Sequence, residues 1–381
     1  MSEPDYEAIA RSGVEALRRG DAAAARAAFA TVESAGRASH QLRLLLAQSC
    51  ELIGDGTAME AALAPVLEAE PRNIYALLMM GENRLRLGDD RAASSWFNLA
   101  LSSASQAQTL QSDLPPRLDR AVASLDAISR RFADHLHARL SAAEVEPAKV
   151  GPRFQEGIDI LVGRAQPQLQ QPTSFYYPRL PQIPFYDPAD FEWVESLEGQ
   201  ADSIRAEAEA VLASGHGLAP YVQRNIDRPT REHALLEDPN WSAYYLWKDG
   251  ALDEEHAQAC PVTAAALGGL PMPRIAGRSP AALFSVLRPR THIPPHWGML
   301  NTRLICHLPL IVPPDCRLRV GNETRTVEAG KMLIFDDSIE HEAWNDSDHT
   351  RVILLFEIWR PELDDAERAA LTAMFESIAL Y

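Results

Sequence analysis

The sequence predicts a multidomain α+β protein in which a helical repeat region precedes a β-barrel. Two patterns carry this prediction. A Gly-Asp pair recurs at a fixed interval near the N-terminus, which is typical of stacked helix pairs. Toward the C-terminus, short apolar runs alternate with turn residues, which is typical of antiparallel strands. We expect the helical repeats to span residues 1–145, an extended proline-rich connector to span 146–190, and the barrel to span 191–381.

The composition fits a folded protein. The 381 residues are enough for two or three domains with separate cores. Hydrophobic residues make up 46% and charged residues 23%, the balance of a folded chain rather than a disordered one. The formal net charge is -17, from 36 basic and 53 acidic residues. Because binding a phosphate backbone needs clustered Lys and Arg, this charge argues against a nucleic acid as partner.

Two features predict a cytoplasmic protein without a membrane span. The first residues, MSEPDYEAIARSG, lack the basic and apolar stretches of a secretory signal, and no run of about 18 uncharged apolar residues is present. The cysteines are scattered, without the Cys-x-x-Cys spacing of zinc or redox sites. We expect reduced and mostly buried thiols, as in cytoplasmic proteins, at Cys50, Cys260, Cys306 and Cys316.

The helical repeats are marked by Gly20-Asp21, Gly54-Asp55 and Gly88-Asp89, each 34 residues after the last. Small and bulky residues keep the same interval, as closely packed helix pairs require: Ala24, Ala58, Ala92, Phe29, Leu63 and Phe97. This period resembles that of the tetratricopeptide repeat. The resemblance implies a groove that binds polypeptide. The alternative is a purely structural role, in which the helices brace the barrel or a dimer.

The middle of the chain predicts a connector, a helix and loops. Residues 168–188 are rich in Pro, Gln and aromatic residues, too proline-broken for a helix and too apolar for a free linker. We expect them to pack in an extended form on the barrel. The periodicity of residues 190–213 predicts a helix that starts near Asp190. From there to about residue 280 we expect loops, which include Trp241.

The C-terminal part predicts antiparallel strands at 281–287, 302–312, 317–320, 324–327, 331–335 and 352–359. Gly321-Asn322 predicts a tight hairpin between the third and the fourth of these strands, because both residues tolerate the positive φ of such a turn. Six or more short strands at this spacing predict a jelly-roll, or double-stranded β-helix, of the cupin kind.

Two histidines in this region are candidate metal ligands. His296 follows Pro294-Pro295, whose fixed φ angles make a stiff approach that aims the next side chain. His341 lies just past an apolar strand, where a side chain can point into the mouth of a barrel. Neutral imidazole binds Fe, Zn, Cu or Ni. A single histidine is more often an ordinary surface or core residue, but the pair in this context favours a metal site.

Arg351 is a candidate anion-binding residue. It opens an apolar strand, of which one alternate face must lie inside the barrel. An inward guanidinium without a partner would cost about 3–5 kcal/mol, so we expect a carboxylate there, either from the protein or from a bound dicarboxylic acid. In the strand at 302–312, period two places Arg303, Ile305 and His307 on one face, which we expect to line the pocket.

The region that contains these residues resembles the aspartyl/asparaginyl β-hydroxylases. The resemblance covers about residues 170–365, almost without gaps from 285 to 363, and is carried by His296-Trp297-Gly298, 301–308, 330–338, 340–344, Arg351 and 359–363. Members of that family are oxygenases of double-stranded β-helix fold that depend on Fe(II) and 2-oxoglutarate. The resemblance therefore implies this fold and this chemistry for the barrel.

The resemblance also implies the ligands of the metal and of the cosubstrate. Fe(II) would bind His296 and His341, and 2-oxoglutarate would chelate the metal and place its far carboxylate on Arg351. Most oxygenases of this fold carry a carboxylate ligand two residues after the first histidine, where this chain has Gly298. The family that the chain resembles has only two histidine ligands, so Gly298 agrees with the resemblance. No catalytic residue beyond the metal site is implied.

Further contacts with the cosubstrate are implied by position. Ser285 would help to hold the far carboxylate, His307 would line the cosubstrate pocket, and Trp241 matches a tryptophan of the family's active site. The chain departs from the animal enzymes at Ile305, where those enzymes have an arginine. We expect Arg303, on the same face of the strand, to take its place in cosubstrate binding.

Together, the residues and the resemblance predict a dioxygenase that hydroxylates the β-carbon of Asp or Asn in a polypeptide, with CO₂ and succinate as coproducts. The helical repeats would recruit that polypeptide. Two alternatives stay open: a 2-oxoglutarate oxygenase that acts on a small molecule, and a binding scaffold of repeats and barrel without catalysis. The presence of both histidines together with Arg351 argues against the scaffold. The substrate and the oligomeric state do not follow from the sequence.

Overall fold

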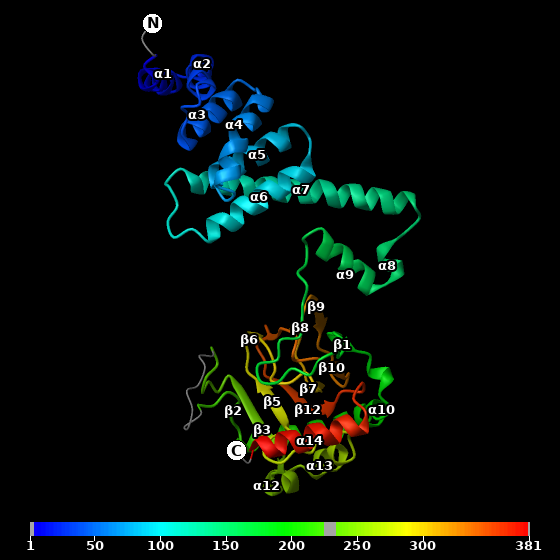
Figure 1. Ribbon diagram of the computed structural model, residues 1–381. Coiled ribbons are helices and arrows are strands. Elements are labelled where there is room, and N and C mark those ends of the chain that lie inside the picture. The colour runs from blue at the N-terminus through cyan, green and yellow to red at the C-terminus, as the bar shows by residue number, and fades with distance from the viewer. Residues whose placement is uncertain (1–3, 225–233, 380–381) are drawn as a thin grey trace. The chain divides into compact units, whose positions relative to one another are not determined.

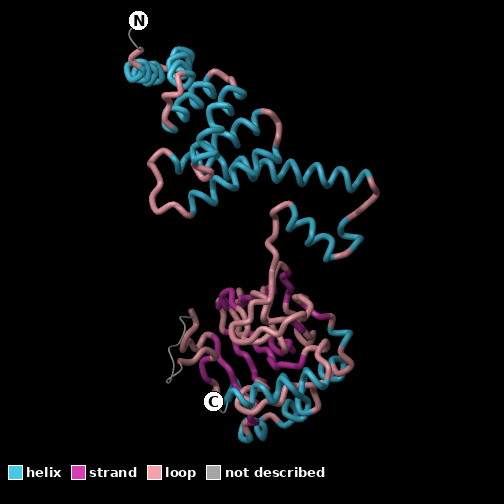
Figure 2. The backbone as a smooth tube through the Cα atoms, in the orientation of Figure 1, coloured by secondary structure: helices cyan, strands magenta, loops and turns pink. Residues whose placement is uncertain are grey.

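The computed structural model describes residues 4–224 and 234–379 and divides the chain into two compact units, residues 1–165 and 166–381. In Figure 2 the described part of the first unit consists of helices and loops, and the strands belong to the second unit. This is the predicted α+β architecture of helical repeats followed by a barrel. None of the described helices combines the length and the apolar character that a bilayer crossing requires. All four cysteines are buried and unpaired, as predicted.

The helical unit begins with three helix pairs, in which α1 packs on α2, α3 on α4 and α5 on α6 (Figure 1). A long helix, α7, and two short ones follow. The bounds are α1 Tyr6–Arg18, α2 Ala22–Ser34, α3 His40–Leu52, α4 Gly56–Ala69, α5 Ile74–Arg86, α6 Asp90–Ser105, α7 Leu114–Ala142, α8 Pro147–Val150 and α9 Pro152–Leu161.

The Gly-Asp repeat marks the turn inside each helix pair. The three glycines have φ of +81°, +77° and +76°, a left-handed conformation that glycine adopts without a steric penalty. The side chain of each following aspartate accepts a backbone N–H bond of 3.0 Å and so caps the second helix of the pair. The interval of 34 residues is therefore the spacing of successive helix turns, as the repeat prediction requires.

A small residue faces a bulky one inside each pair. A Cβ added at Gly81 would lie 2.5 Å from the Phe97 ring, so the aromatic ring occupies the space that a side chain would need. The middle repeat has Ala47 and Leu63 at the positions 34 residues earlier, and both are fully buried. Glycine is thus matched by phenylalanine, and alanine by the smaller leucine, which keeps the interior close-packed.

Gly81→Ala is expected to lower the free energy of unfolding by about 1–3 kcal/mol, because the new methyl group overpacks Phe97. The double variant Gly81→Ala/Phe97→Leu copies the pair of the middle repeat and should recover most of this loss. Urea titrations of the full chain, followed by far-UV circular dichroism, would measure both variants. A double variant no more stable than Gly81→Ala alone would contradict this account of the packing.

The boundary between the units differs from the predicted one. Residues 147–161, which we expected in the extended connector, form α8 and α9 and belong to the helical unit. Pro147 and Pro152 are the first residues of these helices, where a proline removes no helical hydrogen bond and already has a helical φ. The prolines therefore start helices here instead of excluding them.

The barrel unit consists of two antiparallel sheets. Over the described residues, the larger has eight strands in the order β1-β10-β7-β12-β5-β3-β2, with β4 on β3, and the smaller has the order β6-β11-β8-β9. The strand bounds are β1 Phe185–Tyr186, β2 Ala219–Pro220, β3 Trp241–Lys248, β4 Ala251–Leu252, β5 Ala282–Leu287, β6 Thr291–His296, β7 Arg303–Ile311, β8 Cys316–Val320, β9 Glu323–Thr326, β10 Leu333–Phe335, β11 His341–Asn345 and β12 Arg351–Trp359.

Helices cover the face of the larger sheet that is turned away from the smaller one; in Figure 1, α12, α13 and α14 lie on the opposite side from β6, β8 and β9. Alternate residues of β12 divide between two cores. Val352 and Leu354 pack with Ile204 under the helices, whereas Ile353 faces the smaller sheet. The helix bounds are α10 Val194–Glu198, α11 Ala201–Ser214, α12 Glu254–Ala259, α13 Pro261–Gly268 and α14 Asp365–Ala379, with a 3-10 helix at Pro188–Asp190.

Six of the described strands, β1, β2, β3, β4, β6 and β11, lie where the sequence predicted none. β3 falls in the predicted loop region, of which residues 225–233 are outside the described residues. It lies between β5 and β2 and is buried on both faces, so its sequence lacks the alternation that reveals a strand. β6 contains Pro294-Pro295, which is tolerated because β6 is an edge strand that pairs with β11 alone.

Residues 166–190 run along the barrel unit. The Gln170 side chain donates a hydrogen bond of 2.7 Å to Asp336, and Arg360 donates one of 2.7 Å to the same oxygen. Asp336 and Arg360 are fully buried. Further along, β1 pairs with β10. The segment therefore forms part of the barrel wall rather than a free linker.

Candidate active site

A cavity of about 320 Å³ opens between the two sheets of the barrel unit. This volume is at the low end for small-molecule sites, which suits a small acid together with one substrate side chain. The strands bring all seven residues that the sequence singled out into the lining of this one cavity: His296, His341, Arg351, Ser285, His307, Arg303 and Trp241.

The two histidines face each other where β6 meets β11. His296 ends β6, His341 begins β11, and the two are register partners whose ring centroids lie 4.1 Å apart. Nδ1 of the first ring lies 2.8 Å from the carbonyl oxygen of Pro294, and Nδ1 of the second lies 3.1 Å from that of Ile339. Because a carbonyl only accepts, Nδ1 carries the hydrogen and Nε2 keeps its lone pair. This is the tautomer that a metal-binding imidazole needs.

Burial keeps the second ring neutral. The pKa of His341 lies well below its ordinary value, first because the ring is buried and then because His296 is close. A neutral ring can bind a metal ion, whereas an imidazolium cannot. In the part of the chain that the structure describes, no three His, Cys, Asp or Glu side chains are grouped so as to hold a metal ion. The residues present therefore fit a metal as a pair of imidazoles, with other ligands completing its coordination.

Arg351 is a buried cation whose Nε and Nη1 have no hydrogen-bond partner among the described residues. Only 2% of the residue is exposed. Burial lowers the pKa of Arg351 to about 10, although the nearby Cys316 acts in the opposite direction. Each of these nitrogens carries an N–H, so a carboxylate that binds the guanidinium would supply a missing hydrogen-bond acceptor. Of the two partners that the sequence left open, a protein carboxylate does not bond Nε or Nη1 among the described residues, and a bound acid stays a prediction.

The groups around Arg351 are neutral and polar. Burial, followed by the charge of Arg351, lowers the pKa of His307 to about 3, and its Nδ1 has no partner in the described structure. The Ser285 hydroxyl accepts a hydrogen bond of 3.2 Å from Trp241 Nε1, which leaves its own hydrogen free to donate. Trp241 stacks on Tyr221 with ring centroids 4.0 Å apart. This end of the cavity thus offers one cation and neutral polar groups, the setting that an anion needs.

Arg303 lines the cavity, but its contacts differ from the expected role. Its guanidinium forms ion pairs with Glu357 and with Asp337, the latter at 3.3 Å between Nη2 and Oδ2. Glu357 is fully buried and Asp337 is 5% exposed. These two carboxylates engage Nη1 and Nη2, whereas Nε has no hydrogen-bond partner among the described residues, so a role of Arg303 in cosubstrate binding stays a prediction. Ile305 contributes apolar surface to the cavity.

Glu357 and Asp337 are cavity residues that the sequence reasoning missed. A signal existed for Glu357: it lies six residues after Arg351 and therefore on the same, inward face of β12. Asp337 follows the apolar strand β10, next to Asp336. Burial raises the pKa of Asp337 to about 6, against the lowering effect of Arg303. Two carboxylates against one guanidinium make this end of the cavity acidic.

Gly298 touches the carboxylate of Asp337. A Cβ added at this glycine would lie 2.1 Å from Asp337 Oδ2, and the glycine N–H donates a hydrogen bond of 2.6 Å to the Asp337 carbonyl. The space that a carboxylate ligand would need at position 298 is therefore filled by another carboxylate. Glycine at this position is a steric requirement of the site, separate from any question of metal binding.

Gly298→Ala is expected to lower the free energy of unfolding by about 1–3 kcal/mol, because its methyl group overlaps the Asp337 side chain. Gly298→Asp should cost more, since it adds a second carboxylate beside the first in a buried site. Denaturant titrations of the metal-free chain would measure both variants. If Gly298→Ala were as stable as the native chain, Asp337 would not occupy this space.

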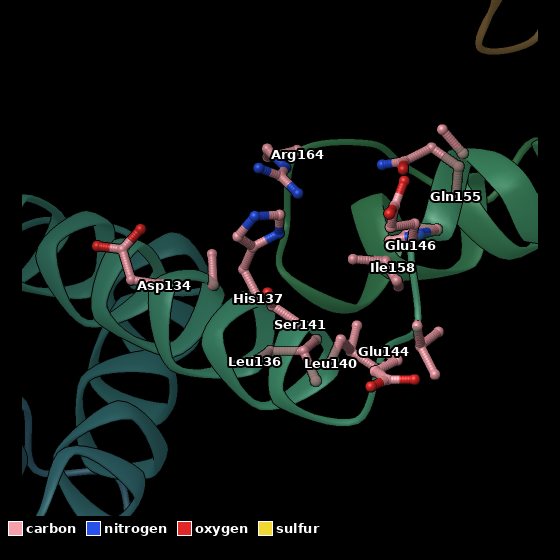
Figure 3. Close-up of a pocket in the computed structure, with 14 residues that line it drawn as sticks. Asp134, Leu136, His137, Leu140, Ser141, Glu144, Glu146, Gln155, Ile158 and Arg164 are labelled. Atoms are coloured by element: carbon pink, nitrogen blue, oxygen red, sulfur yellow. The ribbon is translucent and has the colours of Figure 1, made fainter.

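The helical unit has a larger hollow, of about 1010 Å³, between the C-terminal half of α7 and the α8–α9 segment. Figure 3 shows His137, Arg164 and Glu146 around it. These three residues are exposed. Exposed charges are hydrated, whereas strongly perturbed and unsatisfied groups mark sites of chemistry. The barrel cavity is therefore the candidate active site.

The fold and the cavity define a class of protein: a double-stranded β-helix of the cupin kind in which paired histidines and a buried arginine open onto one cavity. Residues 198–361 match the family model described as Aspartyl/Asparaginyl beta-hydroxylase. This part of the barrel unit is therefore similar to that family, as the sequence resemblance predicted.

Named relatives point to the same family. The chain is 38% identical over 184 residues to the Aspartyl/asparaginyl beta-hydroxylase of Homo sapiens. The aligned region covers 48% of this chain and 23% of that protein. It is 38% identical over 188 residues to the Ornithine lipid ester-linked acyl 2-hydroxylase of Rhizobium tropici, covering 49% and 63%. The Aspartate beta-hydroxylase domain-containing protein 1 of Homo sapiens is 33% identical over 266 residues, covering 68% and 63%. The chain thus spans less than two thirds of each relative.

Solved structures show more distant likenesses. PcrH from Pseudomonas aeruginosa aligns with a TM-score of 0.29 at 20% identity, covering 34% of this chain and 95% of that one. A predicted oxalate decarboxylase from Thermotoga maritima aligns with a TM-score of 0.22 at 11% identity, covering 32% and 81%. The fold assignment rests on the helix packing and strand pairing described above.

Proposed function

We propose that the barrel unit is an Fe(II)- and 2-oxoglutarate-dependent hydroxylase. The observation that carries this proposal is the buried Arg351 guanidinium, whose Nε and Nη1 have no hydrogen-bond partner among the described residues. It lies in the same cavity as two histidines whose Nδ1 atoms are held by carbonyl groups. A cation at one place and a pair of imidazoles at another suit a small diacid that binds a metal ion with one end. The match of residues 198–361 to a family model named for β-hydroxylation supports the reaction type.

His296 and His341 would hold Fe(II) through Nε2, and imidazole is a suitable ligand for this metal. The carbonyl groups of Pro294 and Ile339 fix the planes of the two rings before the metal binds. When bound, iron and 2-oxoglutarate together supply the oxidation of a C–H bond by O₂, with CO₂ and succinate as coproducts.

The remaining cavity residues orient the cosubstrate and exclude water. Arg351 would pair with the far carboxylate, and the Ser285 hydroxyl would donate to the same group. His307 stays neutral beside Arg351, so it adds no charge and can form a hydrogen bond with a bound acid. Ile305 and Leu318 line the cavity with apolar surface, which strengthens the charge pairing because it keeps water away.

For the substrate we propose an Asp or Asn side chain of a polypeptide, the class named by the human relative. The relative from Rhizobium tropici, named for an acyl chain of a lipid, has the same percentage identity and supplies the second candidate. The acidic end of the cavity favours the polypeptide. An alkyl chain placed against the buried Asp337 would leave that carboxylate without a hydrogen-bonding substrate group, which costs free energy.

We further propose that the helical unit binds this polypeptide. A groove in this unit is lined by charged residues of both signs from α3, α5 and the start of α7, among them Glu51, Glu82, Arg86 and Arg117. Glu82 pairs with Arg117 at 3.2 Å, and the pKa of Glu51 is raised by burial and then by Glu82. Such a surface suits a chain that carries both positive and negative side chains.

Incubation of the purified chain with Fe(II), 2-oxoglutarate and O₂ should turn over a substrate and release succinate. One reaction receives a whole-cell peptide extract and the other a lipid extract. We expect peptides heavier by one oxygen atom in the first, with the added mass on Asp or Asn, and none when 2-oxoglutarate is left out. Added oxygen in the lipid arm alone would establish the acyl candidate. Succinate in neither arm, with the metal bound, would refute the proposed chemistry.

A further inference from the structure

The cavity has a second polar end, away from the residues assigned to 2-oxoglutarate. This end is formed by the ion-paired side chains of Arg303, Asp337 and Glu357. Trp297, which precedes Gly298 in the chain, also lines the cavity. The described residues that line the cavity include two Lys or Arg side chains, those of Arg303 and Arg351. Because Arg303 faces two carboxylates, this end carries a net negative charge. A substrate carboxylate would meet this net charge, and the Arg303 guanidinium would offer it Nε alone.

At this end, Arg303 Nε is buried without a hydrogen-bond partner in the described structure, and so are two atoms beside Gly298, Trp297 Nε1 and Asp337 Oδ1. An indole N–H can only donate, and a carboxylate oxygen can only accept. Both residues adjoin Gly298, one as its chain neighbour and the other through the contact of its carboxylate with the glycine. Buried groups without partners are rare in folded proteins and call for a ligand that supplies the missing bonds.

We propose that this end of the cavity recognises a carboxamide, and that the preferred substrate residue is therefore asparagine rather than aspartate. The carbonyl oxygen of a side-chain amide would accept from Trp297 Nε1, and its NH₂ group would donate to Asp337 Oδ1. An aspartate could accept from the indole, but its charge would meet that of Asp337. This inference rests on the proposed function, since it assigns the group that is held beside the reacting carbon.

The chemistry of the Asp337 side chain explains how this end would distinguish an amide from a carboxylate. A carboxylate at position 337 is an acceptor that discriminates by charge, whereas an asparagine there would offer a donor and no charge. The charge of Asp337 is held in place by Arg303, which also pairs with the fully buried Glu357. Asp337→Asn thus removes the discrimination and leaves Arg303 with an ion-pair partner. It is the matched variant for the test.

The test uses the full chain, labelled with ¹⁵N at the tryptophan indoles and loaded with Zn(II) and 2-oxoglutarate, so that no turnover takes place. Binding of 2-oxoglutarate is measured first, and its absence would overturn the proposed function itself. Two matched probes, the N-acetyl N-methylamides of asparagine and of aspartate, are then titrated at pH 7.5. The Trp297 indole signal is assigned by its loss in Trp297→Phe.

We expect the asparagine probe to shift the Trp297 indole signal in a saturable way, and the aspartate probe to bind at least about tenfold more weakly. In Asp337→Asn this preference should shrink to about twofold or reverse. The inference is overturned if the aspartate probe binds the native chain as tightly as the asparagine probe. It is also overturned if neither probe moves the Trp297 signal while 2-oxoglutarate binds normally.

Discussion

Arg351→Met is expected to make the ligand-free chain more stable by about 3 kcal/mol while abolishing the binding of 2-oxoglutarate. The guanidinium is buried, its Nε and Nη1 have no hydrogen-bond partner in the described part of the chain, and burial lowers its pKa from 12.5 to about 10. Since one pKa unit corresponds to about 1.4 kcal/mol, holding this charge at neutral pH costs the fold about 3 kcal/mol. Methionine has a similar volume and no charge, so it removes the cost and also the carboxylate partner.

The measurements are urea titrations of the chain without ligand and thermal shifts with Zn(II) and 2-oxoglutarate added. Native protein should gain stability from the cosubstrate, and the variant should gain none. Arg360→Met is the matched control, because Arg360 is equally buried but pairs with Asp336 at 2.7 Å. That variant should lose about 3–5 kcal/mol, because the buried Asp336 carboxylate loses its cationic partner and keeps only uncharged donors such as Gln170. If both variants were destabilised alike, Arg351 would have a partner within the protein.

His341→Ala is expected to lower succinate formation by more than about 100-fold while the barrel stays folded. The imidazole supplies one of two protein ligands in the proposed site, and even losing a group that only supports a ligand costs about 10–100-fold in metal affinity or activity. The side chain faces a cavity, so its removal leaves little space that was not open already. Succinate release and Fe(II) binding by equilibrium dialysis would measure the effect, with circular dichroism as the test of folding.

His292→Ala provides the control on β6, the strand that pairs with the one that carries His341. Its ring is bonded to Glu342 at 2.8 Å, stacks on Trp344 and is 43% exposed, so it lies outside the cavity. Turnover of this variant should stay within about twofold of the native rate, as is usual for surface changes away from a site. Native turnover by His341→Ala would refute the assignment of the metal ligand, and an equal loss in both variants would point to a general effect on the fold.

The inward and outward faces of the long strands could be predicted from the sequence. Period two placed Arg303, Ile305 and His307 together, and the structure puts all three in the cavity wall. The same rule, continued along β12 from Arg351, reaches Glu357. It fails on β6, where Ile293 and His296 both face inward although they are three residues apart. The pairing of β6 with β11 shifts register between Ile293 and His296, which rotates β6 there. No local sequence pattern predicts this shift.

The partners of the cavity charges also escaped the sequence. Arg303 was expected to bind the cosubstrate, but it meets Asp337 and Glu357, which lie 34 and 54 residues further along the chain. Residue type alone told us that a guanidinium on an inward face needs an anion. It did not tell us which anion, because the answer depends on which strands are neighbours in the sheet.

By itself, the sequence identified the helical repeat and the inward faces of β7 and β12. It also identified the candidate metal ligands His296 and His341 and the candidate anion-binding residue Arg351. Each of these is encoded within one segment, by spacing, by capping or by period two. The tertiary structure alone decided that Trp241 lies in a central strand, that Pro147 and Pro152 start helices, and that carboxylates neutralise Arg303. These outcomes depend on contacts between residues far apart in the chain, and the free energy that selects them comes from burial and charge pairing, which exist only once the sheets have come together.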